Sequence, residues 1–155
     1  MDQQNNEQQA QPVFNIEKIY VKDLSVEVPN APQVFLEQQS PAISVDISTS
    51  AAPLDKGFFE VVLRTTVTAK FEGDRTVFLV EVAQAGIFQL QNIPQEDLEP
   101  LLMIGAPNVL FPYVRETVSD AVTRAGFQPV LLAPVNFENL YVARQQQLAQ
   151  QAGNA

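Results

Sequence analysis

The feature that most constrains the fold is a two-residue alternation of apolar and polar side chains between residues 14 and 90. Segments 14–28 and 42–49 alternate in this way, which predicts strands with one buried face. Segments 57–71 and 75–90 are rich in β-branched and aromatic residues. The intervening Glu72-Gly73-Asp74 predicts a hairpin turn, because glycine readily adopts positive φ. Four strands with short connections predict an antiparallel sheet.

The pattern becomes helical after the fourth strand. Asn92-Ile93-Pro94 and the acids that follow predict the start of a short helix, with Asn92 as its cap and a proline in its first turn. Gly105-Ala106-Pro107 predicts its end. Asn108 is predicted to cap a second helix, whose apolar residues recur at three- and four-residue steps as far as Ala125. Residues 127–135 then predict an apolar crossing segment bounded by prolines.

Strands followed by helices, rather than alternating with them, predict an α+β fold: a four-stranded antiparallel sheet with helices packed on one face. Asn136 is predicted to cap a third helix. The length of 155 residues suits one domain, which we place at residues 13–144. Residues 1–12 and 145–155 are rich in Gln, Asn and Ala, and they predict a disordered N-terminal tail and a mobile C-terminal tail.

The composition excludes several functional classes. The chain has no His and no Cys, which rules out Ser-His-Asp and Cys-His nucleophiles, zinc fingers and disulfides. Its formal net charge of −9 repels the phosphates of nucleic acids. The isolated Gly86 and Gly105 match no glycine-rich nucleotide loop. We therefore expect no catalytic activity, no metal site and no cofactor.

The chain also lacks the signals of export or membrane insertion. The N-terminus is polar and acidic, without the apolar run of a signal peptide. No segment reaches the roughly 18 apolar residues that a transmembrane helix needs. We expect a cytoplasmic protein that does not insert into a membrane.

Both faces of the later strands carry apolar residues. On the fourth strand, Val77, Leu79 and Ile87 alternate with a second apolar set. Helices cover one face of a sheet, so the other face needs a cover, which we expect to be a second subunit. Loops and the last helix are the alternative cover. The predicted oligomer interface consists of Phe78, Val80, Val82 and Gln84.

Carboxylates are the second unusual feature of the strands. Asp23 and Glu27 are four residues apart, so regular alternation places both on one face. Glu81 and Leu79 share a face on the fourth strand. If the two strands are neighbours, these residues form an acidic patch with an apolar centre. A plain solvated sheet face and a general acid–base pair are the alternatives.

Several segments together are similar to those of a known family, over roughly residues 14–145. The earlier ones run from Ile19 to Ser25, from Pro29 to Pro32 and from Phe59 to Arg64 with Val67-Thr68. The later ones are Gly86-Ile87-Phe88, Pro107-Asn108-Val109-Leu110-Phe111-Pro112-Tyr113 with Arg115-Glu116, and Leu132-Ala133-Pro134-Val135-Asn136-Phe137. Their order and spacing resemble the SecB family of bacterial export chaperones.

The resemblance implies a function as well as a fold. It implies a cytoplasmic homotetramer, a dimer of dimers, which holds secretory preproteins unfolded without ATP and delivers them to the SecA ATPase. It also implies that the docking site for SecA maps onto Asp23, Glu27, Leu79 and Glu81. The docking tail of SecA is basic and carries its own zinc, so the charges are complementary.

The same resemblance implies long apolar grooves for unfolded clients, bounded by the second strand, the crossing segment and the helices. Any one of these residues is as compatible with an ordinary core as with a client contact. The positions that correspond to the grooves are Ile43, Val45, Ile47, Tyr113, Leu132, Phe137 and Tyr141.

The chain departs from the family at a few positions. Val80 and Leu101 stand where members often have cysteines, and Gln39 stands where some have tryptophan. The C-terminal tail is shorter and less acidic than in some members. Two other functions stay open: a SecB-like chaperone for a non-export client such as an antitoxin, and an enzyme that uses Glu81 with a neighbouring acid.

Overall fold

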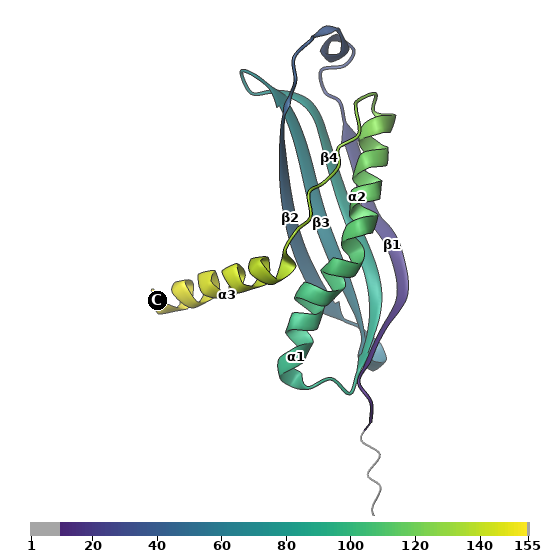
Figure 1. The fold of residues 1–155 in the computed structure, drawn as a ribbon, viewed down its shortest axis with the longest axis vertical. Helices are drawn as coiled ribbons and strands as arrows, with labels where there is room; N and C mark the ends of the chain where they lie inside the picture. Colours follow the sequence, from purple (N-terminus) through teal and green to yellow (C-terminus); the bar gives the residue numbers. More distant parts are fainter. Residues whose placement is uncertain (1–9, 155) are drawn as a thin grey trace, which may run out of the picture.

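A computed structural model of the chain describes residues 10–154, so most of the predicted N-terminal tail lies outside the described residues. Its four strands form one antiparallel sheet in the order β1-β4-β3-β2 (Figure 1). The strands are β1 (Val13–Glu27), β2 (Ala42–Pro53), β3 (Phe58–Phe71) and β4 (Arg75–Gln91). The predicted antiparallel sheet is confirmed, and β1 and β2 are its edges.

The hairpin between β3 and β4 forms where it was predicted. Gly73 and Asp74 both have positive φ, at 79° and 62°. Lys70 and Asp74 form an ion pair across the turn, with Nζ and Oδ1 2.8 Å apart. The turn fixes the register of the longest strand pair in the centre of the sheet.

Strand β1 does not alternate regularly, contrary to the sequence prediction. Its pairing with β4 shifts between Ile16 and Lys18 and again between Val21 and Asp23. Each shift is a β-bulge, which leaves one residue unpaired and exchanges the faces of the residues that follow. The side chains of β1 on the helix-covered face are therefore Phe14, Ile16, Ile19, Val21, Leu24 and Val26.

Helix α1 (Gln95–Pro100) continues without a break through a π-helical turn, η3 (Leu101–Gly105), into α2 (Ala106–Arg124). The predicted helix end at Gly105-Ala106-Pro107 and the cap at Asn108 are both wrong. In the wider π turn the Ala106 N–H donates to the Leu101 carbonyl, and the helix passes through its prolines without stopping.

The start of α1 also differs from the prediction. Its N-cap residue is Pro94, without a side-chain cap. Asn92 instead has a φ of 57°, and its Nδ2 donates to the Gln11 carbonyl at 3.0 Å. Asn92 therefore fastens the N-terminal end of β1 to the end of β4 rather than capping the helix.

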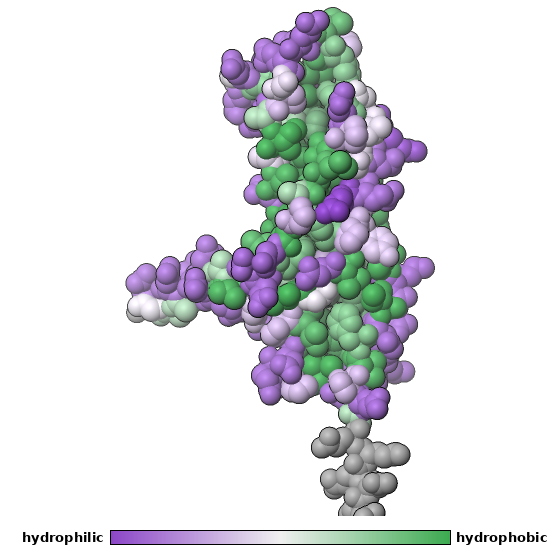
Figure 2. Space-filling model, in the orientation of Figure 1, coloured by the Kyte–Doolittle hydropathy of each residue, from purple (hydrophilic) through white to green (hydrophobic). Residues whose placement is uncertain are grey.

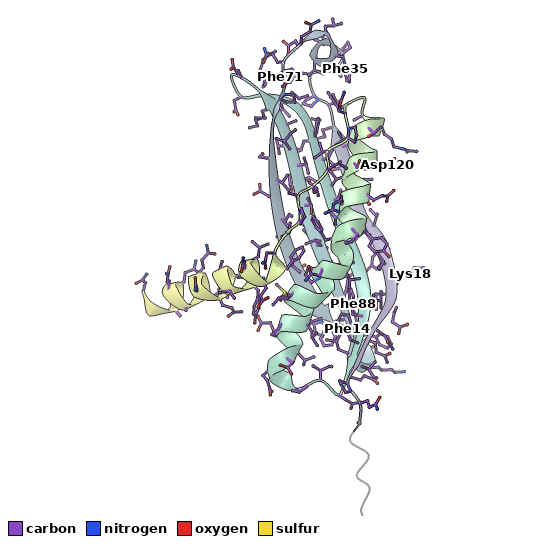
Figure 3. The ribbon with its side chains drawn as sticks, viewed as in Figure 1. Phe14, Lys18, Phe35, Phe71, Phe88 and Asp120 are labelled. Carbon is purple, nitrogen blue, oxygen red and sulfur yellow. The ribbon has the colours of Figure 1, made fainter. Side chains whose placement is uncertain are left out.

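The core lies between α2 and one face of the sheet (Figure 1). Leu110, Val114 and Val118 of α2 are fully buried against it. At one end of the sheet, Phe14 of β1 lies against Phe88 of β4, with ring centroids 5.6 Å apart (Figure 3). The predicted fold, α+β with helices on one face of a four-stranded sheet, is confirmed.

The residues of the predicted oligomer interface lie in the packing beneath α2, and their contact with a second subunit stays a prediction. Phe78, Val80 and Val82 belong to the core of the subunit itself, and Gln84 is only 3% exposed. These side chains lie on the face that α2 covers, so they are not available on the surface of one subunit. Val77 is also in this core, because the β3–β4 pairing shifts beside it.

After α2 the chain runs back along the sheet near β2, and α3 (Phe137–Gly153) then projects from the body (Figure 1). The predicted cap is confirmed, since Asn136 Oδ1 accepts from the Asn139 N–H at 2.9 Å. Residues 145–153, which composition predicted as a mobile tail, continue this helix.

Candidate functional site

A long trough follows the inner side of β2, on the face that carries the helices. It consists of three hollows of about 770, 350 and 480 Å³. The first and second share Ile47 and Leu140, and the second and third share Thr49, Met103 and Arg144. Shared walls make the hollows consecutive, so the trough extends along most of the strand.

The largest hollow is strongly apolar. One wall is the exposed edge strand β2, and the other is the crossing segment Pro129–Val135, with Leu140 of α3 at its end. Leu131 is 76% exposed there, although it is a large apolar residue. The space-filling view shows apolar residues gathered in the body, whereas α3 is mostly hydrophilic (Figure 2). An extended apolar segment of another polypeptide would fit this surface.

The opposite end of the trough is more polar. Its hollow lies between β2 and α1, and Gln95, Glu99 and Arg144 are among its lining residues. Gln145 Nε2 donates to Glu99 Oε1 at 3.2 Å, which ties α3 to α1 beside it. The trough therefore combines apolar contacts at one end with hydrogen-bonding groups at the other.

The structure brings six of the seven predicted groove residues together. Ile43, Val45, Ile47 and Leu132 line the apolar hollow, and Phe137 and Tyr141 line the middle one. Tyr113 is exposed on α2 and lines none of the three hollows. Whether clients contact these residues stays a prediction.

Two of these six residues also belong to the core. Leu132 and Phe137 are 6% and 3% exposed, so they form the floor of the trough rather than its open walls. Phe137 packs edge-on against Phe111 of α2, with ring centroids 5.9 Å apart, and so anchors the start of α3. Sequence reasoning missed Leu131 and Met103, because an irregular segment and a π turn have no period that assigns side chains to a face. It also left out Leu140, which lies on the regular helix α3.

The predicted acidic patch lies on the other face of the sheet. Strands β1 and β4 are neighbours, and their register pairs Glu27 with Leu79 and Ser25 with Glu81. Asp23 is opposite Ala83, one pair further along. The four predicted residues are therefore grouped, and Asp23, Glu27 and Glu81 are exposed. Their role in docking stays a prediction.

Neighbouring side chains shape the field of this patch. Arg64 of β3 pairs with Ala83 and is exposed, so a basic group stands in the same cross-strand row as Asp23. Further along the face, Glu60 accepts one hydrogen bond from Lys22 and one from Tyr20. Both bonds lower the pKa of Glu60, and the bond from Lys22 has the larger effect. Burial is the largest cause that raises the pKa of Tyr20 to about 12.

Neither a metal centre nor a membrane span is found in the described part of the chain. Within residues 10–154, no group of three or more Asp or Glu side chains is arranged to hold a metal ion. No helix in that range is long and apolar enough to cross a membrane. Glu81, the proposed acid of a carboxylate enzyme, lines none of the three hollows of the trough.

Comparison with known proteins decides the family. The model of the family described as preprotein translocase subunit SecB matches residues 7–148. This chain belongs to the SecB family. The resemblance seen in the sequence is confirmed, and with it the function at the level of the family, that of a protein-export chaperone.

Relatives in the SecB family match almost the whole chain. The protein-export protein SecB of Aromatoleum aromaticum is 67% identical over 90% of this chain and 88% of its own length. That of Chromobacterium violaceum is 62% identical over 97% and 99%. That of Neisseria gonorrhoeae is 57% identical over 94% and 98%.

A solved SecB-like chaperone of Mycobacterium tuberculosis, in complex with a peptide from an antitoxin, has the same fold. Its TM-score is 0.61 at 19% sequence identity, over 79% of this chain and 90% of that chain. At this identity the likeness concerns the fold alone.

Proposed function

We propose that the trough along β2 holds unfolded secretory preproteins and that the acidic patch delivers them to SecA. The observation that carries the proposal is the separation of the two surfaces. The trough opens on the helix-covered face, and Asp23, Glu27, Leu79 and Glu81 lie on the opposite face. A client in the trough therefore leaves the acidic patch accessible to a second protein.

The apolar hollow accounts for binding without sequence selection. Each apolar side chain that a client buries fully contributes about 1.5–3 kcal/mol. Micromolar affinity requires about −8 kcal/mol, so a few partly filled subsites are enough when several subunits engage one chain. Leu131 and Val45 supply exposed apolar surface for such contacts, and an extended client can follow the neighbouring backbone of edge strand β2.

Electrostatics accounts for docking of SecA. Glu27 is opposite Leu79, and Glu81 and Asp23 follow along the same strand pair, so a basic partner gains from this row of carboxylates mainly in association rate and specificity. Charge reversal of Asp23 and Glu81 should weaken binding of SecA at low salt and leave client affinity unchanged. Equal SecA affinity of the wild type and the double variant in a titration would remove this assignment.

Strand β1 supports the self-assembly that a dimer of dimers requires. It is an edge strand whose side chains on the helix-covered face remain open beyond the reach of α2. The exposed members are Ile16, Val21, Leu24 and Val26. An apolar stripe next to an unpaired strand edge is a surface that a second copy can cover by symmetry. This surface is open on one subunit, whereas the interface residues predicted from the sequence lie beneath α2.

The cytoplasm is the location that suits this function, because the clients are held before export. An antitoxin as the client has less support than a preprotein, since the relatives of high identity are protein-export proteins.

A further inference from the structure

The second bulge of β1 decides on which face the acidic patch forms. Before it, Ile19 and Val21 point toward the helix layer, and the pairing shift then leaves Lys22 unpaired. Because of this shift, Asp23 turns to the outer face and Leu24 to the inner one. Regular alternation after Val21 would instead point Asp23 toward α2 and Leu24 toward solvent.

Side chains on the outer face hold the bulged segment. Lys22, the unpaired residue, places Nζ 2.7 Å from Glu60 Oε1. The Tyr20 hydroxyl donates to the other oxygen of the same carboxylate. Glu60 belongs to β3, and β4 lies between β1 and β3, so both side chains span a complete strand.

The composition of β4 makes this span feasible. The β4 residue opposite Tyr20 is Ala85, which is 0% exposed; with Ala83, which is 3% exposed, it forms a small apolar cluster with Tyr20 and Val62. Larger side chains at these alanines would fill the space above the strand. The small residues thus leave room for a polar bridge with an apolar floor.

The same segment is also held from the inner face. Gln84 Nε2 donates to the Tyr20 carbonyl at 3.1 Å, and the Thr117 hydroxyl of α2 donates to Gln84 Oε1 at 3.3 Å. Gln84 is 3% exposed, so the groups that it contributes to these bonds are shielded from water. Tyr20 is therefore fixed through its backbone on one side of the sheet and through its hydroxyl on the other.

We propose that Glu60 is a positioning residue: by binding Tyr20 and Lys22 across β4, it holds the bulge at Lys22 and so keeps Asp23 on the acidic outer face. The binding partner in this proposal rests on the proposed function, whereas the effect on the bulge does not. Glu60 acts through β1 and does not itself contact SecA.

The test is Glu60→Gln, which keeps the size of the side chain and removes its charge. We expect faster amide hydrogen exchange from Tyr20 to Leu24, and SecA affinity about fivefold lower than that of the control variant. Client affinity should stay the same, because the trough lies on the other face. The matched control is Glu17→Gln, which makes the same charge change at an exposed position of β1.

Tyr20→Phe provides a second variant that removes one hydroxyl only. It should speed hydrogen exchange at the same amides, by a smaller factor than Glu60→Gln. The proposal would be overturned if the amides from Tyr20 to Leu24 exchanged at the wild-type rate in both Glu60→Gln and Tyr20→Phe. It would also be overturned if Glu60→Gln and Glu17→Gln bound SecA with equal affinity. If the wild type itself fails to bind SecA, the proposed function fails, and hydrogen exchange alone decides on the positioning role.

Discussion

At the scale of single residues, Gly86 shows how closely α2 lies on the sheet. A Cβ added there would be 2.8 Å from Phe88 Cε2 and 3.2 Å from Leu110 Cδ2. We expect Gly86→Ala to lower the free energy of unfolding by about 1–3 kcal/mol, because the helix or the ring must shift. Chemical denaturation measures the effect. The control is Gly153→Ala, where nothing lies within 4 Å of the new atom; equal stabilities of the two variants would contradict the packing.

Tyr20 makes the stability of the subunit fall with rising pH in the alkaline range. Burial first, and the bond to Glu60 second, raise its pKa from the usual 10.0 to about 12. The preference of the folded state for the protonated phenol is complete below pH 10 and is lost as the pH rises toward 12. The wild type should therefore lose unfolding free energy relative to Tyr20→Phe over this window, as measured in urea at a series of pH values. Parallel pH curves for the two proteins would contradict this assignment.

At the scale of elements, the clean periodic segments were predictable and the irregular ones were not. The alternation around Ile43, Val45 and Ile47 predicted β2, and the family resemblance implied that this strand forms one wall of a groove. The same rule failed on β1, because a bulge exchanges faces without leaving a distinctive residue behind. Gly105 and Pro107 resembled a helix end, but a π turn carries the helix through them. Tertiary packing decides these cases, and a single sequence does not report it.

The trough also yields a test at this scale. Leu131→Ser removes exposed apolar surface from the largest hollow, so client affinity should fall about threefold to tenfold with little change in stability. Leu36→Ser is the control, since Leu36 is 83% exposed and lines none of the three hollows. Titration of both variants with a labelled, unfolded preprotein compares them. An equal loss of affinity in both would show that general surface hydrophobicity, rather than the trough, binds the client.

At the scale of the whole molecule, the exposed apolar stripe of β1, formed by Ile16, Val21, Leu24 and Val26, is a surface that we expect a second copy to cover. Leu24→Glu places a charge in the centre of this stripe, so we expect the assembly to dissociate into smaller species at micromolar concentration. Analytical ultracentrifugation measures the change. Asn15→Glu, on the outer face of the same strand, should leave the assembly intact. A wild type that sediments as a monomer would contradict the proposed self-assembly.

The net charge of −9 has two effects at this scale. As a whole it keeps a molecule with an open apolar trough soluble. Locally, the register of β1 and β4 gathers some of it around Leu79. Composition predicted the first effect, and the spacing of the carboxylates predicted the second. The bulge that makes the second effect work was visible only in the structure.

The most direct test of the central claim is a refolding assay with a signal-bearing preprotein diluted from denaturant. The wild type should slow folding of the preprotein in proportion to its concentration, without ATP, and added SecA should release the bound chain. The Asp23 and Glu81 charge-reversal variant should slow folding equally well but resist release by SecA. Folding of the preprotein at its unassisted rate in the presence of excess wild type would contradict the account.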